Sequence, residues 1–137
     1  MQQIFSKIAP TQLLHVLVKT DEVAESRANL SEDSQGLQVS VVQLSKGRQV
    51  APHIHNPRTR REPLPLDITQ ECWMVVRGLL RVKLFDLDRT LLQDTTLGAN
   101  WLLVTFQGGH ALECLEEPAT MVECKNGPYL GRDYTSF

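Results

Sequence analysis

The sequence predicts an all-β fold, built as a barrel or a sandwich of short strands. Two observations carry this prediction: short apolar runs alternate with polar positions, and turn residues separate those runs at regular intervals. No amphipathic helical pattern is longer than the N-terminal segment. The chain has 137 residues, of which 42% are hydrophobic and 22% are charged. These values indicate one globular domain with one core.

The first expected strands lie in the N-terminal half of the chain. Residues 11–25 mix apolar and polar positions, which fits either a short helix or an edge strand, and we expect a strand. A polar, turn-like segment at 31–36 precedes an alternating strand at 37–44. The next strand, 49–55, contains Pro52 and should therefore be an edge strand or locally irregular, because proline cannot donate a backbone hydrogen bond.

The second half of the chain predicts a further series of short strands. Gly78 should provide the positive φ of a tight hairpin between the first two of them. The expected ranges are 71–76, 79–85, 90–97, 101–106, 110–115 and 121–125.

Charge and cysteine usage exclude several classes of protein. The 14 Lys and Arg residues and 16 Asp and Glu residues give a net charge of −2, which argues against nucleic-acid and anionic-membrane binding. No apolar run approaches the roughly 20 residues that span a bilayer. No secretory leader is evident, so we expect a cytoplasmic protein. The 3 cysteines form no CxxC pair and are expected to be reduced, buried thiols.

Histidine and glutamate residues within these strands predict a metal site. His53 and His55 should point the same way, because side chains alternate faces along a strand. Glu71 and His110, on other strands, could complete a pocket of four ligands. Histidine nitrogens with one carboxylate oxygen suit a transition metal such as Zn, Fe, Mn or Ni. Glu62 is a second choice for the carboxylate.

The first motif of this sequence resembles that of the cupin superfamily. Gly47 is followed by five residues and then by His53 and His55 in a His-x-His pattern. Glu71 is followed by six residues and then by Gly78. The 15 residues between His55 and Glu71 exceed the short gap of the family, so we interpret 56–70 as a loop inserted within the motif.

The second cupin motif is less complete. His110 stands at the histidine of the motif, whereas Thr105, Gln107 and Cys114 replace the proline, glycine and asparagine of the family pattern. The resemblance implies a jelly-roll barrel, also called a double-stranded β-helix. It also implies that His53, His55, Glu71 and His110 hold one divalent transition metal.

The resemblance also indicates how the chain is organised. It implies a single cupin domain over 1–137, with an N-terminal extension at 1–36 and a barrel core at 37–125. Residues 27–30 and 125–129 are similar to those of small single-domain cupin metalloproteins from bacterial surface-polysaccharide gene clusters.

Several further residues are candidates for substrate contact. Arg58, Arg60 and Arg61 most simply form a solvated loop, although they suit the diphosphate of a nucleotide sugar because guanidinium groups bind phosphate oxygens in pairs. Trp73 is expected in the pocket wall. No general base is evident outside the metal ligands, and Glu62 and Tyr129 are the two catalytic candidates (His15 is expected to be structural).

Three functional hypotheses follow from this site. The leading one is a sugar or sugar-nucleotide isomerase or epimerase of polysaccharide biosynthesis, in which the metal acts as a Lewis acid. The second is an Fe(II)-dependent dioxygenase acting on a small molecule. The third is a non-catalytic cupin that binds a small ligand or a partner, since a fold does not determine a function. Under all three we expect a homodimer in which the N-terminal strand pairs with a second subunit.

Overall fold

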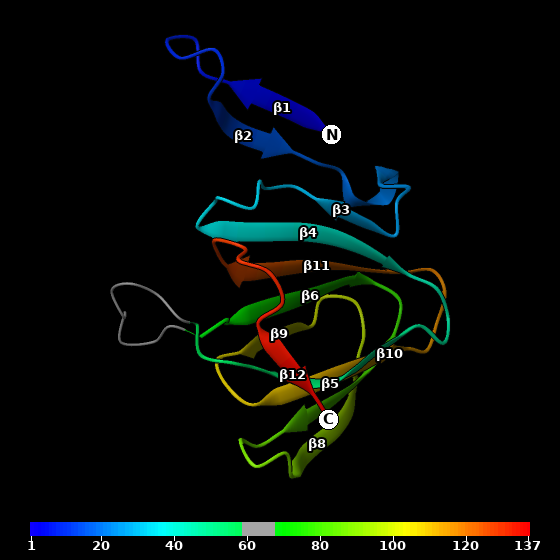
Figure 1. Cartoon of the computed structure of the whole chain (residues 1–137). Helices are drawn as coiled ribbons and strands as arrows, with labels where there is room; N and C mark the ends of the chain where they lie inside the picture. The colour runs from blue at the N-terminus through cyan, green and yellow to red at the C-terminus, as the bar shows by residue number, and fades with distance from the viewer. Residues whose placement is uncertain (59–67) are drawn as a thin grey trace.

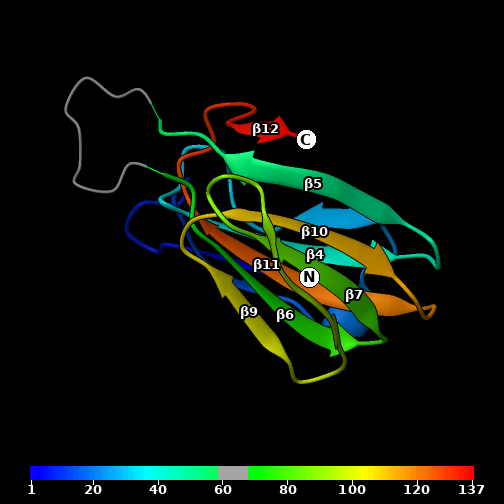
Figure 2. The ribbon, with the colours of Figure 1, turned by 90° about the horizontal axis from the view of Figure 1, so that it is seen from below.

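The structure is a computed structural model that describes residues 1–58 and 68–137. Its regular elements are β-strands and one short 3-10 turn, η1 (Thr20–Glu22). Two five-stranded antiparallel sheets pack face to face, and Figure 2 shows β5, β10 and β7 of one layer against β4, β11 and β6 of the other. The described part of the chain thus forms the all-β, two-layered architecture that the sequence predicts.

Each sheet combines strands from distant parts of the chain. Sheet I has the order β12 (Tyr134–Ser136), β5 (Gln49–His55), β10 (Gly109–Cys114), β7 (Leu80–Phe85) and β8 (Leu91–Leu97). Sheet II has the order β3 (Arg27–Asn29), β4 (Leu37–Leu44), β11 (Ala119–Asn126), β6 (Glu71–Arg77) and β9 (Leu102–Thr105). The chain crosses repeatedly from one sheet to the other, as in a jelly roll.

The predicted hairpin around Gly78 is wrong. β6 lies in sheet II and β7 lies in sheet I, so the two strands do not pair. The glycine does have a positive φ of 86°, and a Cβ at this position would come within 2.7 Å of the Ala119 backbone. A glycine turn of this kind fits a hairpin and a crossing between sheets equally well, because only tertiary packing selects the strands that pair.

β5 is irregular at the position of its proline, as predicted. His53 pairs with His110 of β10, but Val50 pairs with Leu112, so β5 has one residue more than its partner over this interval. This β-bulge at Ala51 and Pro52 changes which face the strand presents. Val50 therefore packs against the core on the same side of β5 as the two buried histidines, while Ala51 is exposed.

The core lies between the two sheets. Its buried apolar side chains come from both layers, and Val82, Leu80 and Val75 are at most 1% exposed. Burial of such residues provides about 1.5–3 kcal/mol each relative to exposure. The other members of the core are Val42, Leu44, Trp73, Leu97, Leu112, Cys114, Ala119 and Met121.

Three strands were not predicted from the sequence as separate elements. β1 (Gln2–Phe5) pairs only with β2 (Leu13–Leu17) among the described residues, and this hairpin lies beside β3 and β4 in Figure 1. β2 confirms the strand expected within 11–25. β3 and β12 each occupy an outer position in a sheet. No helix in the described part of the chain is long and apolar enough to cross a membrane.

Candidate metal centre

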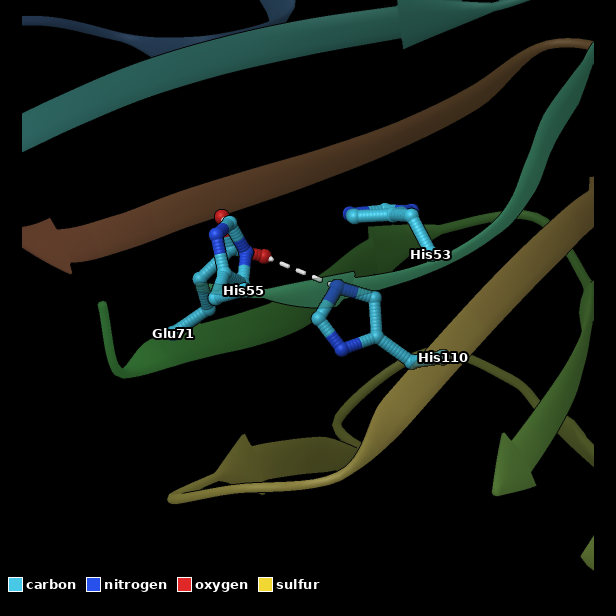
Figure 3. Close-up of side chains that lie close together, drawn as sticks. All are labelled: His53, His55, Glu71 and His110. Atoms are coloured by element: carbon cyan, nitrogen blue, oxygen red, sulfur yellow. Dashed lines mark ion pairs between the residues drawn. The ribbon is translucent and has the colours of Figure 1, made fainter. Parts of the chain in front are cut away.

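Four buried side chains converge between the two sheets. His53 and His55 come from β5, His110 from β10 and Glu71 from β6. One nitrogen or oxygen atom of each lies within 4.8 Å of those of the other three. Figure 3 shows the three imidazole rings and the carboxylate directed toward one another. The structure therefore brings together all four residues of the predicted set.

The local structure of each strand explains this convergence. His53 and His55 share one face of β5, and His110 pairs directly with His53 across the sheet. His110 lies on the same face of β10 as Leu112 and Cys114, which belong to the core. Glu71 completes the set from sheet II, which packs opposite.

Glu71 lies between two of the histidines. Its Oε1 is 3.2 Å from Nε2 of His55, and its Oε2 is 3.2 Å from Nε2 of His110. The rings of His53 and His110 stand edge to face, with their centroids 4.4 Å apart. The Trp73 ring also packs against His110, and the two ring centroids are 4.7 Å apart. This contact places Trp73 in the wall of the site.

Burial and neighbouring charges determine the protonation of these groups. Burial would raise the pKa of Glu71, but the close approach of His110 and His55 outweighs it and holds this pKa well below its usual range. Burial lowers the pKa of His53, which keeps its imidazole neutral. Burial would also lower the pKa of His55, but Glu71 and Asp133 outweigh it and raise that pKa. A metal ion requires the ionised carboxylate and neutral imidazoles, so its binding would release the proton that the raised pKa of His55 favours.

Unpartnered buried nitrogens test whether these residues fit a metal. Nε2 of His55 and both ring nitrogens of His110 are buried and form no hydrogen bond with the residues described. In the described part of the chain, the two Nε2 atoms have only the Glu71 carboxylate nearby, each at 3.2 Å, and Nδ1 of His110 has no partner; coordination to a cation would satisfy the buried nitrogens and the carboxylate together. Three imidazole nitrogens and one carboxylate oxygen form a donor set suited to a divalent transition metal with open coordination positions.

Asp133 is a part of the site that the sequence did not reveal. Its Oδ1 lies 3.2 Å from Nδ1 of His55, so it can accept a hydrogen bond that turns Nε2 toward the cluster. It also accepts hydrogen bonds from Thr69 and, at 3.2 Å, from Nε of Arg58. These contacts lower the pKa of Asp133, although burial opposes them. Tyr134 follows, with its ring centroid 4.7 Å from that of His53.

The other predicted contact residues have different surroundings. Arg58 is bound to structural acceptors, because its guanidinium also donates to the carbonyl oxygens of Gly127 and Asn126. Its role in substrate contact stays a prediction. Arg60, Arg61 and Glu62 lie outside the described residues. His15 is exposed on β2 and does not belong to the cluster.

A cavity of about 630 Å³ opens beside the cluster. His53, His55, Glu71 and Trp73 line it, and so does Tyr129, which is 47% exposed. Polar and charged side chains of sheet II line a further part: Arg27, Asn29, Gln38, Ser40, Glu123 and Lys125. The arrangement is a polar pocket with buried metal-type donors in its wall, as expected for a site that takes a small molecule.

No protein-family model matches this chain, and no curated protein matches it in sequence. Similarity in structure is widespread. A double-stranded β-helix protein from Klebsiella pneumoniae matches with a TM-score of 0.63 and 19% identity, over 88% of this chain and 89% of that one. KdgF from Halomonas sp. matches with a TM-score of 0.55 and 18% identity, over 73% and 77% of the two chains.

Oxalate decarboxylase from Bacillus subtilis is also similar in structure. It matches with a TM-score of 0.58 and 18% identity over 76% of this chain, which spans only 24% of that enzyme's length. A further structure of the same enzyme concerns its Mn(II) centres. Together the likenesses show that the chain is a small domain with the cupin-type, double-stranded β-helix fold, which confirms the predicted fold class.

Proposed function

We propose that this protein is a metal-dependent enzyme in which His53, His55, Glu71 and His110 hold one divalent transition metal, either Zn, Fe, Mn or Ni. The observation that carries the proposal is the convergence of four buried donor groups, three of which line a cavity of about 630 Å³. The Mn(II) centres of the structurally similar oxalate decarboxylase support it as an analogy. On a five- or six-coordinate metal, four protein ligands leave one or two open positions, which favours a catalytic site over a closed structural one.

The proposed reaction is the isomerisation or epimerisation of a sugar or a sugar nucleotide. A metal bound here would supply Lewis-acid polarisation of a carbonyl or enediolate oxygen. The protein's own residues would orient the substrate and exclude water, with Trp73 forming one wall beside His110. Tyr129, which lines the cavity, stays a candidate for proton transfer, and Glu62 stays a second one.

The proposal includes a cellular setting. The similarity of residues 27–30 and 125–129 to small cupins of surface-polysaccharide gene clusters supports a role in that synthesis. We propose a cytoplasmic homodimer, in which the N-terminal strands contribute to the contact between subunits.

The metal content of the purified protein tests the proposal directly. We expect about one metal per chain by elemental analysis of untagged protein that has not met a chelator, and its loss in His53→Ala and His110→Ala, because each variant removes one of four donors. His15→Ala is the matched control, since His15 is exposed on β2 and lies outside the cluster. A wild-type protein that stays metal-free after reconstitution would contradict the proposal.

The same preparations separate the reaction classes. A metal-loaded protein whose melting temperature rises with a sugar nucleotide, and whose His53→Ala variant shows no such rise, supports the isomerase or epimerase. Iron in the site together with oxygen uptake would instead favour the dioxygenase. No response to sugars or sugar nucleotides in the metal-loaded protein would contradict the sugar assignment while leaving the metal site intact.

A further inference from the structure

Lys125 lies beside the candidate metal centre on the inner face of sheet II. It is the direct cross-strand partner of Glu71, so both side chains project into the cavity. Its Nζ is 3.8 Å from Oε1 of Glu71 and 3.7 Å from Oε1 of Glu123. The ammonium group is partly buried, with its side chain 22% exposed, and lies 5.9 Å from the centre of the Tyr129 ring, but it makes no hydrogen bond among the described residues. Three donors of one cation therefore remain available at this wall of the cavity.

The neighbouring carboxylate, Glu123, already has closer partners. Both of its oxygens accept hydrogen bonds from the guanidinium of Arg27. Arg27 also donates to Ser40 at 3.0 Å and to Asn29 at 3.1 Å, and Ser40 donates to Asn29 at 2.9 Å. This network comes from three adjacent strands of sheet II, so Glu123 is held in place and its charge is balanced by Arg27.

The carboxylates near Lys125 in the cavity wall all have closer partners. Asp133 pairs with Arg58 and faces His55, and Glu71 belongs to the proposed metal site. Glu123 pairs with Arg27. Lys125 touches Glu71 and Glu123 only at distances beyond a hydrogen bond. Because Lys125 shares both neighbouring carboxylates with closer partners, its partly buried charge is only partly balanced, and a ligand anion at this position would be stabilised.

We propose that Lys125 binds an oxyanion of the substrate, and that the substrate is a small molecule carrying a carboxylate next to a hydroxyl or carbonyl oxygen. This inference rests on the proposed metal site, which would take the neighbouring oxygen. Lys125 lies close to Glu71. A ligand whose first oxygen reaches the four-residue cluster can therefore place a neighbouring oxygen against the ammonium group of Lys125. Arg27 and Glu123 act as positioning residues that hold the wall beside it.

Binding of a matched pair of probes tests the proposal. Glycerate carries the predicted carboxylate beside a hydroxyl, whereas glyceramide has the same shape without the charge. We expect the wild-type protein, loaded with metal, to bind glycerate at least about tenfold more tightly than glyceramide in calorimetric titrations, in line with one charge-assisted contact. Lys125→Met should lose that preference, and Lys125→Arg should keep most of it because the positive charge remains.

Controls separate this inference from the proposed function. Lys83→Met is the matched control, because Lys83 also lies on a strand, β7, but does not line this cavity. Metal content is measured on each sample, and Lys125→Met should keep the wild-type value. Metal-loaded wild type that binds neither probe, or both equally, overturns the inference alone, as does an unchanged preference in Lys125→Met. A wild-type protein without metal overturns the proposed function.

Discussion

Asp133 shows how one residue outside the four-residue cluster can influence its geometry. It accepts from His55 on one side, and from Arg58 and Thr69 on the other, so its carboxylate is fixed from several directions. The hydrogen bond to Nδ1 leaves Nε2 of His55 to face Glu71. Carboxylate partners of this kind orient ligating histidines and tune their basicity in metal sites.

We expect Asp133→Asn to weaken metal binding by about 10–100-fold. The neutral amide of asparagine lacks the negative charge with which Asp133 orients the His55 imidazole. Competition with a chelator of known affinity would measure the change, and circular dichroism would show that the variant is folded. Asp94→Asn is the control, since Asp94 pairs with exposed Arg81 on the outer side of sheet I. Equal metal affinity of the two variants would remove Asp133 from the site.

The sequence predicted the four residues of the cluster but not Asp133, for a physical reason. His53, His55, Glu71 and His110 stand in a recognisable spacing on expected strands. Asp133 follows an irregular segment after residue 126, where no alternating pattern indicates a strand. It reaches His55 only because β12 pairs with β5, an interaction between residues 78 positions apart.

At the scale of elements, the turn after β6 joins the two sheets. Gly78 combines a positive φ with a close approach to the Ala119 backbone, so two separate constraints require glycine here. The turn positions Glu71 and Trp73 in sheet II relative to the core strand β7 in sheet I.

Gly78→Ala should therefore destabilise the fold by about 1–3 kcal/mol, because an alanine side chain is strained at this φ and also meets the neighbouring backbone. Chemical denaturation followed by fluorescence would measure the loss in the free energy of unfolding. Gly36→Ala is the control, because a Cβ there meets no atom within 4 Å and the φ is not positive. A loss at Gly78 no larger than at Gly36 would contradict this account.

The strands were predicted correctly where the local sequence of a strand is enough to identify it. The expected ranges 37–44 and 49–55 coincide with β4 and β5, because apolar alternation and flanking turns mark both ends. The pairing of strands could not be predicted from the sequence as well, as the wrong hairpin between β6 and β7 shows. Local turn chemistry is the same in both arrangements, while the choice of partner depends on the packing of two whole sheets.

At the scale of the whole molecule, the barrel has an apolar part and a polar part. Along the inner face of β11, Met121 belongs to the core and gives the cavity an apolar wall, while Glu123 and Lys125 line it with charged groups. The N-terminal hairpin lies apart from this division, and its strands pair only with each other among the described residues. Stability and site chemistry therefore both depend on the two sheets rather than on the hairpin.

Deletion of residues 1–18 should leave both the barrel and its metal content intact, because no residue of the hairpin belongs to the core or to the cluster. The deletion retains η1, whose Thr20 carbonyl accepts a hydrogen bond from Gln43 of β4. Light scattering would also test the predicted homodimer, which should dissociate if the N-terminal strands form its contact. A dimer of unchanged mass would place that contact elsewhere.

The bulge in β5 separates two roles of a single strand. Val50, before the bulge, packs against the core, and the residues from His53 onward present donor groups. The one additional residue between them lets the side chains on both sides of the bulge point into the barrel. Val50 lines the same cavity as His53 and His55, so the bulge brings an apolar side chain and the donor groups to one face of β5. A substitution at Val50 would consequently alter both the packing of the barrel and the shape of the space beside the imidazoles.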